Sequence, residues 1–82
     1  MLAKVKFHCR ELVGSIENGE YDIPEGSTVK DFMDFLQQNA GETIPEENFE
    51  SMVYMVNGKP AQEDTPLTEG AFMRVLYKIL GG

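Results

Sequence analysis

Apolar and polar residues alternate along the first part of the chain. Residues 2–10 carry an apolar set and a polar set at alternate positions, the period of two that is typical of a half-buried strand. Residues 10–14 break this alternation and end in Gly14, which predicts a turn or a short helical turn. Residues 15–23 regain extended character, and the turn dipeptide Asn18-Gly19 allows this second strand to begin only after Gly19. The first strand's inward set is Val5, Phe7 and Cys9, and its outward set is Lys4, Lys6 and His8.

The next segment has the pattern of an amphipathic helix. The helix is predicted to begin at Ser27 or Thr28 and to run to about Asn39. Thr28 with Asp31 three positions later resembles a capping box, and Gly41 is a suitable helix stop. The apolar positions recur at i, i+3, i+4 and i+7, so they form one stripe. These positions are Val29, Phe32, Met33 and Leu36.

The third quarter of the chain reads as a loop followed by a hairpin. Residues 42–50 are acidic and are predicted to be irregular. Residues 52–56 are apolar at every position, which favours a short strand covered on both sides or a buried inner strand. Asn57-Gly58 is a strong hairpin signal, and residues 60–62 are predicted to return as a brief edge strand that tolerates proline.

A final strand over residues 71–80 completes the predicted order of strand, strand, helix, strand, short strand, strand. This order indicates an α+β domain in which one helix covers one face of a mixed sheet and leaves the other face open. If the first and last strands are neighbours, the open face combines large apolar residues with basic ones, as protein–protein contacts do. The alternative is that charged residues point outward on such a sheet by default. The residues in question are Lys4, Lys6, His8, Phe72, Arg74, Leu76 and Lys78.

Length and composition restrict the function. The chain has 82 residues, enough for one small domain over residues 1–80 with a flexible tail at 81–82, and too few to spare for an active-site cleft. It carries 14 acidic and 7 basic side chains, so its net charge of −7 does not favour nucleic acid or an anionic membrane as a partner. It has one cysteine and one histidine, so neither an internal disulfide nor a zinc site is expected, and a cytoplasmic location is predicted.

The sequence ends in Leu80-Gly81-Gly82. Glycine adds no apolar area to a core and loses the most backbone entropy on ordering. A diglycine suits a tail that enters a narrow active site of another protein, where a β-carbon would obstruct. The terminal carboxylate would then be the reacting group, and because it is a poor electrophile it must first be activated, most simply by adenylation with ATP.

Taken in order, these features resemble the ubiquitin-like sulfur carriers with the β-grasp fold, the MoaD/ThiS family. The resemblance covers nearly the whole chain and is greatest to carriers of the MoaD type, which form the small subunit of molybdopterin synthase. It implies a mixed sheet of four to five strands with one main helix on one face. The matching segments are the alternating first strand, Arg10-Glu11-Leu12-Val13-Gly14, the Thr28-capped helix, Val56-Asn57-Gly58, Thr65-Pro66-Leu67, Glu69-Gly70 and Gly81-Gly82.

The resemblance implies a carrier mechanism in which the catalytic residues belong to partners. An adenylating enzyme of the ubiquitin-activating type (MoeB/ThiF-like) would use ATP to activate the Gly82 carboxylate, with Gly81 giving the tail access. A sulfur donor would convert the adenylate to a thiocarboxylate, and a large synthase subunit (MoaE-like) would accept the tail. The chain would not be an enzyme on its own and would bind no cofactor or metal itself. The predicted partner-binding residues are Lys4, Lys6, Phe72, Arg74, Leu76, Lys78 and Leu80.

Three other functions remain open at this stage. The chain could carry sulfur for thiamin thiazole, as ThiS-like carriers do. It could be a ubiquitin-like modifier that joins Gly82 to lysines of target proteins, since the same tail and activation chemistry would serve. It could also be a plain β-grasp interaction module whose terminal glycines are incidental. A thiocarboxylate would separate the carriers from the interaction module, and adducts on cellular proteins would favour the modifier.

Overall fold

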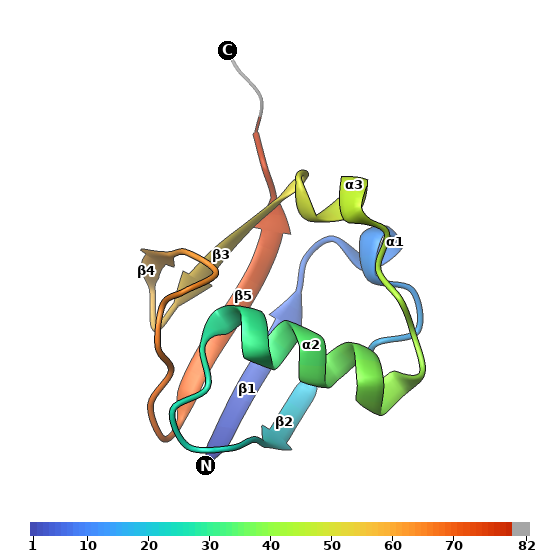
Figure 1. Ribbon diagram of the computed structural model, residues 1–82. Helices are drawn as coiled ribbons and strands as arrows, with labels where there is room; N and C mark the ends of the chain where they lie inside the picture. Colours follow the sequence, from blue (N-terminus) through green and yellow to red (C-terminus); the bar gives the residue numbers. More distant parts are fainter. Residues whose placement is uncertain (80–82) are drawn as a thin grey trace.

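In the computed structural model, which describes residues 1–79, five strands form one mixed sheet in the order β2-β1-β5-β3-β4 (Figure 1). The first and last strands, β1 and β5, pair in parallel, and the other pairs are antiparallel. The main helix, α2, lies across one face of the sheet (Figure 1), so the predicted α+β arrangement is confirmed. The elements are β1 (Leu2–Phe7), α1 (Arg10–Val13), β2 (Gly19–Asp22), α2 (Val29–Ala40), α3 (Glu46–Phe49), β3 (Met52–Val56), β4 (Lys59–Ala61) and β5 (Ala71–Tyr77).

Helix α2 begins and ends where its capping residues stand. The Thr28 hydroxyl accepts a hydrogen bond from the Asp31 backbone N–H at 3.2 Å, and the Asp31 carboxylate accepts one from the Thr28 N–H at 3.0 Å. Gly41 takes the left-handed conformation at φ 64° and donates its N–H to the last turn. The predicted stripe is buried in full: Val29, Phe32, Met33 and Leu36.

Replacing Thr28 with alanine is expected to lower the free energy of unfolding by about 1 kcal/mol, because the Asp31 N–H loses its acceptor. Urea unfolding followed by circular dichroism measures the change. Thr43→Ala is the matched control, since Thr43 is exposed and its side chain makes no hydrogen bond within residues 1–79. Equal stability of the two variants would contradict a capping role for Thr28.

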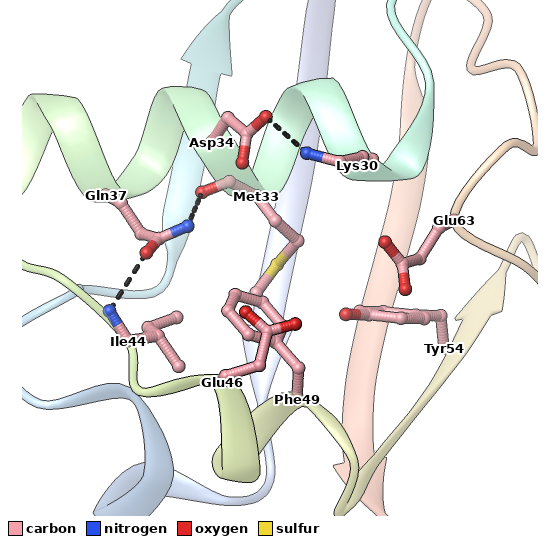
Figure 2. Close-up of a pocket in the computed structure, with 9 residues that line it drawn as sticks. All are labelled: Lys30, Met33, Asp34, Gln37, Ile44, Glu46, Phe49, Tyr54 and Glu63. Atoms are coloured by element: carbon pink, nitrogen blue, oxygen red, sulfur yellow. Dashed lines mark hydrogen bonds and ion pairs between the residues drawn. The ribbon is translucent and has the colours of Figure 1, made fainter.

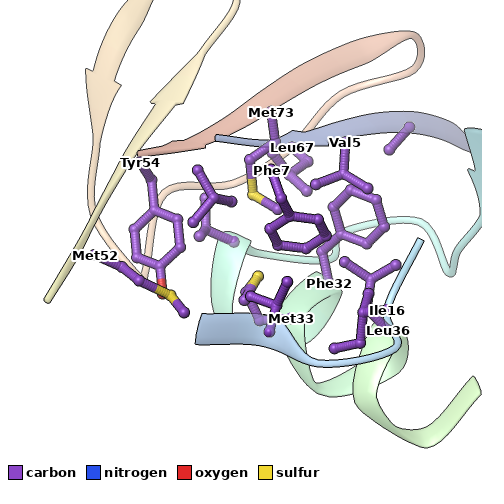
Figure 3. Close-up of a cluster of buried hydrophobic side chains, with 14 of the residues drawn as sticks. Val5, Phe7, Ile16, Phe32, Met33, Leu36, Met52, Tyr54, Leu67 and Met73 are labelled. Carbon is purple, nitrogen blue, oxygen red and sulfur yellow. The ribbon is translucent and has the colours of Figure 1, made fainter. Parts of the chain in front are cut away.

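The core lies between α2 and the covered face of the sheet (Figure 3). All three inward residues predicted for the first strand, Val5, Phe7 and Cys9, are buried. Met73 and Val75 of β5 lie beside them, and the α2 stripe packs from the other side. Loop residues complete this core, notably Ile16 and Leu67. The helical stripe and the alternating strands therefore pack as their sequence periods require.

Residues 52–56 form an inner strand of the sheet, between β5 and β4, but the alternative that they are covered on both sides is wrong. In β3, Met52 and Tyr54 face the core, but Val53 is 40% exposed and Met55 is half-buried. The strand thus has one face on the core and one on the uncovered side of the sheet. One half of this apolar run packs in the core and the other half forms an apolar surface. Both halves have the same residue types, so the periodicity of the sequence does not distinguish them.

Three strands are shorter than predicted, whereas β3 has the predicted bounds and β4 begins one residue earlier, at Lys59. β1 ends at Phe7, and β2 begins at Gly19, the later of the two starts that the sequence allowed. β5 ends at Tyr77, although the apolar alternation continues to Ile79. Tyr77 is 41% exposed and Ile79 is 93% exposed, because the chain has by then run past the core.

Two predictions about the connecting segments have different outcomes. Residues 42–50 contain the short helix α3 and are therefore not wholly irregular as predicted. The hairpin at Asn57-Gly58 is confirmed, with φ of 52° and 80°, the two positive values that a type I′ turn needs. The predicted boundary between domain and tail at residue 80 lies outside the described residues.

Candidate functional site

The sheet face that α2 does not cover brings the predicted partner-binding residues of the first and last strands together. Lys4 pairs with Phe72 and Lys6 with Arg74, so the predicted neighbourhood of these strands is confirmed. Strands β2, β3 and β4 add further side chains through their register with β1 and β5. We call this surface the open face: Leu2, Lys4, Lys6, His8, Glu20, Asp22, Val53, Met55, Pro60, Phe72, Arg74 and Leu76.

The centre of the open face is apolar. Leu76 pairs directly with Val53, and Met55 pairs with both Arg74 and Pro60. Leu76 and Met55 are half-buried, while Val53 is 40% exposed. Contiguous exposed apolar side chains with a polar rim mark a binding surface more often than scattered ones do.

Arg74 and Phe72 form the boundary between the apolar centre and the basic strand β1. The Arg74 guanidinium carbon lies 4.9 Å from the centre of the Phe72 ring, within cation–π range. The Arg74 Nη1 also lies 3.5 Å from the His8 Nε2. Arg74 can therefore cover apolar surface with its stem while its charge stays available to a partner.

Phe72 is held in place by the hairpin turn. The Asn57 side-chain oxygen accepts a hydrogen bond from the Phe72 N–H at 2.9 Å, and the Asn57 N–H donates to the Phe72 carbonyl at 2.9 Å. The Phe72 ring also lines a shallow hollow of about 270 Å³ together with Lys4, Lys6 and Glu20. A partner side chain could enter this hollow without displacing the core.

Sequence reasoning missed six residues of the open face and overstated its basic character. The missed residues are Leu2, Glu20, Asp22, Val53, Met55 and Pro60. Glu20 of β2 pairs with Lys4, and Asp22 pairs with Leu2, so carboxylates flank the basic strand. Val53 and Met55 were missed because the apolar run of β3 was read as buried on both sides. The alternation within residues 19–22 was the available signal for the two acids. The open face is therefore apolar at its centre, with basic β1 and acidic β2 on one side.

The end of β5 leads the chain toward its C-terminus at one end of the sheet (Figure 1). The last backbone hydrogen bond within residues 1–79 is donated by the Lys78 N–H to the Ser51 carbonyl at 2.8 Å. Lys78 lies just beyond β5 and lines a cavity with Val53 rather than extending the strand. The predicted site residues Leu80, Gly81 and Gly82 lie outside the described residues.

His8 and Cys9 do not form a nucleophile and base pair. His8 is exposed on the open face, whereas Cys9 is fully buried and its Sγ lies 3.6 Å from the Val75 carbonyl. Burial, with a smaller contribution from the charge of Glu11, raises the pKa of the Cys9 thiol. Cys9 therefore acts as a small core residue, as the sequence indicates.

No group of three or more His, Cys, Asp or Glu side chains within residues 1–79 is arranged to hold a metal ion. No helix in the same range is long and apolar enough to cross a membrane.

Solved structures of small ubiquitin-like proteins share this fold. Small archaeal modifier protein 1 of Haloferax volcanii superposes with a TM-score of 0.72 at 16% identity, covering 95% of this chain and 98% of that one. A protein described as molybdopterin converting factor subunit 1 from Pyrococcus furiosus gives 0.66 at 23% identity, with 95% and 98% covered. A complex of subunits 1 and 2 of the molybdopterin-converting factor of Helicobacter pylori gives 0.57 at 23% identity, with 100% of both chains covered. The fold is therefore the ubiquitin-like β-grasp.

A search of curated protein sequences finds no match to this chain. The model of the ThiS family matches residues 8–82, a range that begins directly after β1 and includes every later element and the diglycine. This match spans most of the chain and agrees with the fold and with the open face. The chain therefore belongs to the ThiS family, whose members are ubiquitin-like sulfur carriers of the MoaD/ThiS kind.

Proposed function

We propose that this protein is a sulfur carrier whose Gly82 carboxylate is adenylated and then converted to a thiocarboxylate. The observation that carries the proposal is the family match, which extends through residue 82 and so includes Gly81-Gly82. The geometry is compatible with it, because β5 both contributes to the open face and leads to the C-terminal residues.

The proposed chemistry proceeds in two steps on the terminal carboxylate. A MoeB/ThiF-like enzyme binds the open face, and a carboxylate oxygen of Gly82 attacks the α-phosphorus of ATP with release of pyrophosphate. Sulfide from a sulfur donor then attacks the acyl carbon. The bond between this carbon and the phosphate oxygen breaks, and AMP leaves with that oxygen. The product is a thiocarboxylate, which is ionised at neutral pH and more nucleophilic than a carboxylate.

We propose molybdopterin synthesis as the pathway, with this chain as the small subunit beside a MoaE-like large subunit. Supporting this choice, two proteins of the same fold are described as subunit 1 of molybdopterin converting factors, and one of them is in complex with its subunit 2. The open face offers an apolar centre for such a subunit. Catalytic acid–base residues would belong to the large subunit.

A protein modifier is the second candidate, and one specific observation favours it. Small archaeal modifier protein 1 shares the fold with the highest TM-score of the three structures compared above. In that case the acyl-adenylate would be passed to a lysine amine of a target protein. Transfer of sulfur to a thiazole precursor is the other alternative, since ThiS-like carriers give the matched family its name.

The test is intact-mass spectrometry of the purified chain after incubation with a MoeB/ThiF-like adenylating enzyme from the same organism, ATP and a sulfide donor. The expected result is a mass change equal to one oxygen replaced by one sulfur. An ATP analogue with a methylene group between the α and β phosphorus atoms is the control and should give no change. No mass change with ATP would refute the carrier proposal.

A second stage separates the pathways. The thiocarboxylate form is mixed with the MoaE-like subunit and the cyclic pterin precursor, and dithiolene formation is measured. Turnover supports the molybdopterin assignment. Thiocarboxylate without turnover, combined with turnover by thiazole synthase or with isopeptide adducts on cell proteins, would replace it by the corresponding alternative.

A further inference from the structure

A second site lies away from the open face, on the side of the sheet that carries the helices. Helices α2 and α3, strand β3 and the loop after β4 enclose a cavity of about 250 Å³ (Figure 2). Its floor is apolar and partly aromatic. The floor residues are Met33, Ile44, Phe49 and Tyr54.

Tyr54 places an unused polar atom in this cavity. Its side chain is only 8% exposed, and its hydroxyl makes no hydrogen bond to any residue within 1–79. Figure 2 shows the hydroxyl directed toward the space between Met33 and Glu63. Burial, together with the charge of Glu63, raises the pKa of Tyr54 to about 12, so the phenol is neutral at physiological pH. The hydroxyl oxygen itself is reachable from the cavity, because no side-chain nitrogen or oxygen within residues 1–79 is both fully buried and without a hydrogen-bond partner. A ligand that enters the cavity can therefore bind it.

The rim of the cavity is negatively charged. Three carboxylates and one lysine line it, and the Lys30 ammonium is already bound to Asp34 at 3.0 Å. Glu46 and Glu63 make no ion pair within residues 1–79. In the view of Figure 2 the Tyr54 hydroxyl lies between these two carboxylates. A cationic group entering the cavity would therefore meet two unpaired carboxylates and a neutral acceptor.

The part of the cavity wall formed by Gln37 and Ile44 is held in place before any ligand arrives. The Gln37 side-chain oxygen accepts a hydrogen bond from the Ile44 N–H at 2.9 Å. The Gln37 amide donates to the Met33 carbonyl at 3.2 Å. These bonds tie the loop after α2 to the helix itself, so less ordering is needed on binding.

We propose that this cavity binds the guanidinium group of an arginine side chain presented by a partner protein. A guanidinium is flat, stacks on aromatic rings such as Phe49 and Tyr54, and has five N–H donors for the carboxylates of Glu46 and Glu63. The Tyr54 oxygen is a further acceptor. An ammonium group is more strongly hydrated and matches the aromatic floor less well.

The surroundings of the cavity favour a side chain on a protein over a free small molecule. A second cavity of about 360 Å³ adjoins the first and shares Phe49, Tyr54 and Glu63 with it. It reaches Pro60 and Ala61 of the edge strand β4. The backbone on either side of a bound arginine would have room there. No open-face residue lines the first cavity, whereas Val53 and Pro60 of the open face also line the second, so a partner backbone lying there would reach the edge of the open face.

The test uses the full-length chain labelled with ¹⁵N and an acetylated, amidated Gly-Arg-Gly peptide as the probe. The expected result is saturable movement of the amide signals of Ile44, Phe49 and Tyr54 in NMR titrations. Glu63→Gln is expected to weaken the apparent affinity about ten-fold, and Tyr54→Phe about three-fold. Glu25→Gln, an exposed acid that lines neither cavity, is the matched control and should bind as the parent chain does.

Two further peptides make the assignment specific. The same peptide with citrulline in place of arginine keeps the shape and removes the charge, and it is expected to give no saturable shift. The lysine peptide is expected to bind more weakly than the arginine peptide. Equal binding of either peptide, unchanged affinity in Glu63→Gln, or shifts confined to the open face would overturn the proposal.

Discussion

Removal of Gly81 and Gly82 is expected to abolish thiocarboxylate formation completely while leaving the stability of the domain unchanged. The reason is that the residues that stabilise the fold are different from those that take part in the reaction. Within residues 1–79 no buried core residue follows Val75, and the last backbone hydrogen bond is donated by Lys78. Intact mass after incubation with the adenylating enzyme measures the chemistry, and thermal unfolding measures the stability.

The matched control for this deletion is Gly82→Ala, which keeps the length and the terminal carboxylate but adds a β-carbon. We expect it to be thiocarboxylated much more slowly than the parent chain, because the tail enters a narrow site. A truncated chain that still acquires sulfur would contradict the assignment of Gly82. A truncated chain that unfolds at a lower temperature would contradict the separation of tail and core.

A negative charge at the centre of the open face is expected to prevent complex formation without unfolding the domain. Leu76→Asp and Phe72→Asp each place a carboxylate where a partner would have to bury it. Loss of a central interface residue typically reduces affinity by about 2 kcal/mol or more, at least about 30-fold, and a buried unpaired charge adds to that loss. Both side chains are only half-buried in the free chain, so their effect on stability should be small.

Isothermal titration with the adenylating enzyme and with the large subunit measures this effect. Ala40→Asp is the control, because Ala40 is an exposed apolar residue at the end of α2, away from the open face. Circular dichroism confirms that each variant is folded. Parent-like affinity of both Leu76→Asp and Phe72→Asp would show that the partners bind elsewhere on the domain.

Local sequence signals were sufficient to predict the elements whose ends and conformation are determined by residues close together in the chain. Helix α2 could be predicted because its cap, its apolar stripe and its stop all lie within residues 28–41 and agree with one another. The hairpin at Asn57-Gly58 could be predicted for the same reason, since its two positive φ angles suit those residue types. The pairing of the first and last strands required an assumption about topology, and the register of Lys4 with Phe72 bears it out.

Features that depend on long-range contacts could not be read from sequence patterns. Whether Val53 faces a core or solvent depends on whether a second layer covers that face of the sheet. The cavity beneath α2 brings Tyr54 together with Glu63 and residues of two helices, and no spacing along the chain encodes that meeting. The exposure of Tyr77 and Ile79 follows from where the core stops, which a continuing alternation does not reveal.

The position of β5 in the middle of the sheet has a consequence for biosynthesis. β5 bridges β1 and β3, so the two halves of the sheet have no hydrogen-bonded link until residues 71–77 have been made. Non-local pairing of this kind is slow to form and leaves apolar strands uncovered on the nascent chain. The native sheet is therefore expected to form only after residues 71–77 have left the ribosome. Any chain terminated before β5 would lack the native sheet, and it could not present a complete open face to the activating enzyme.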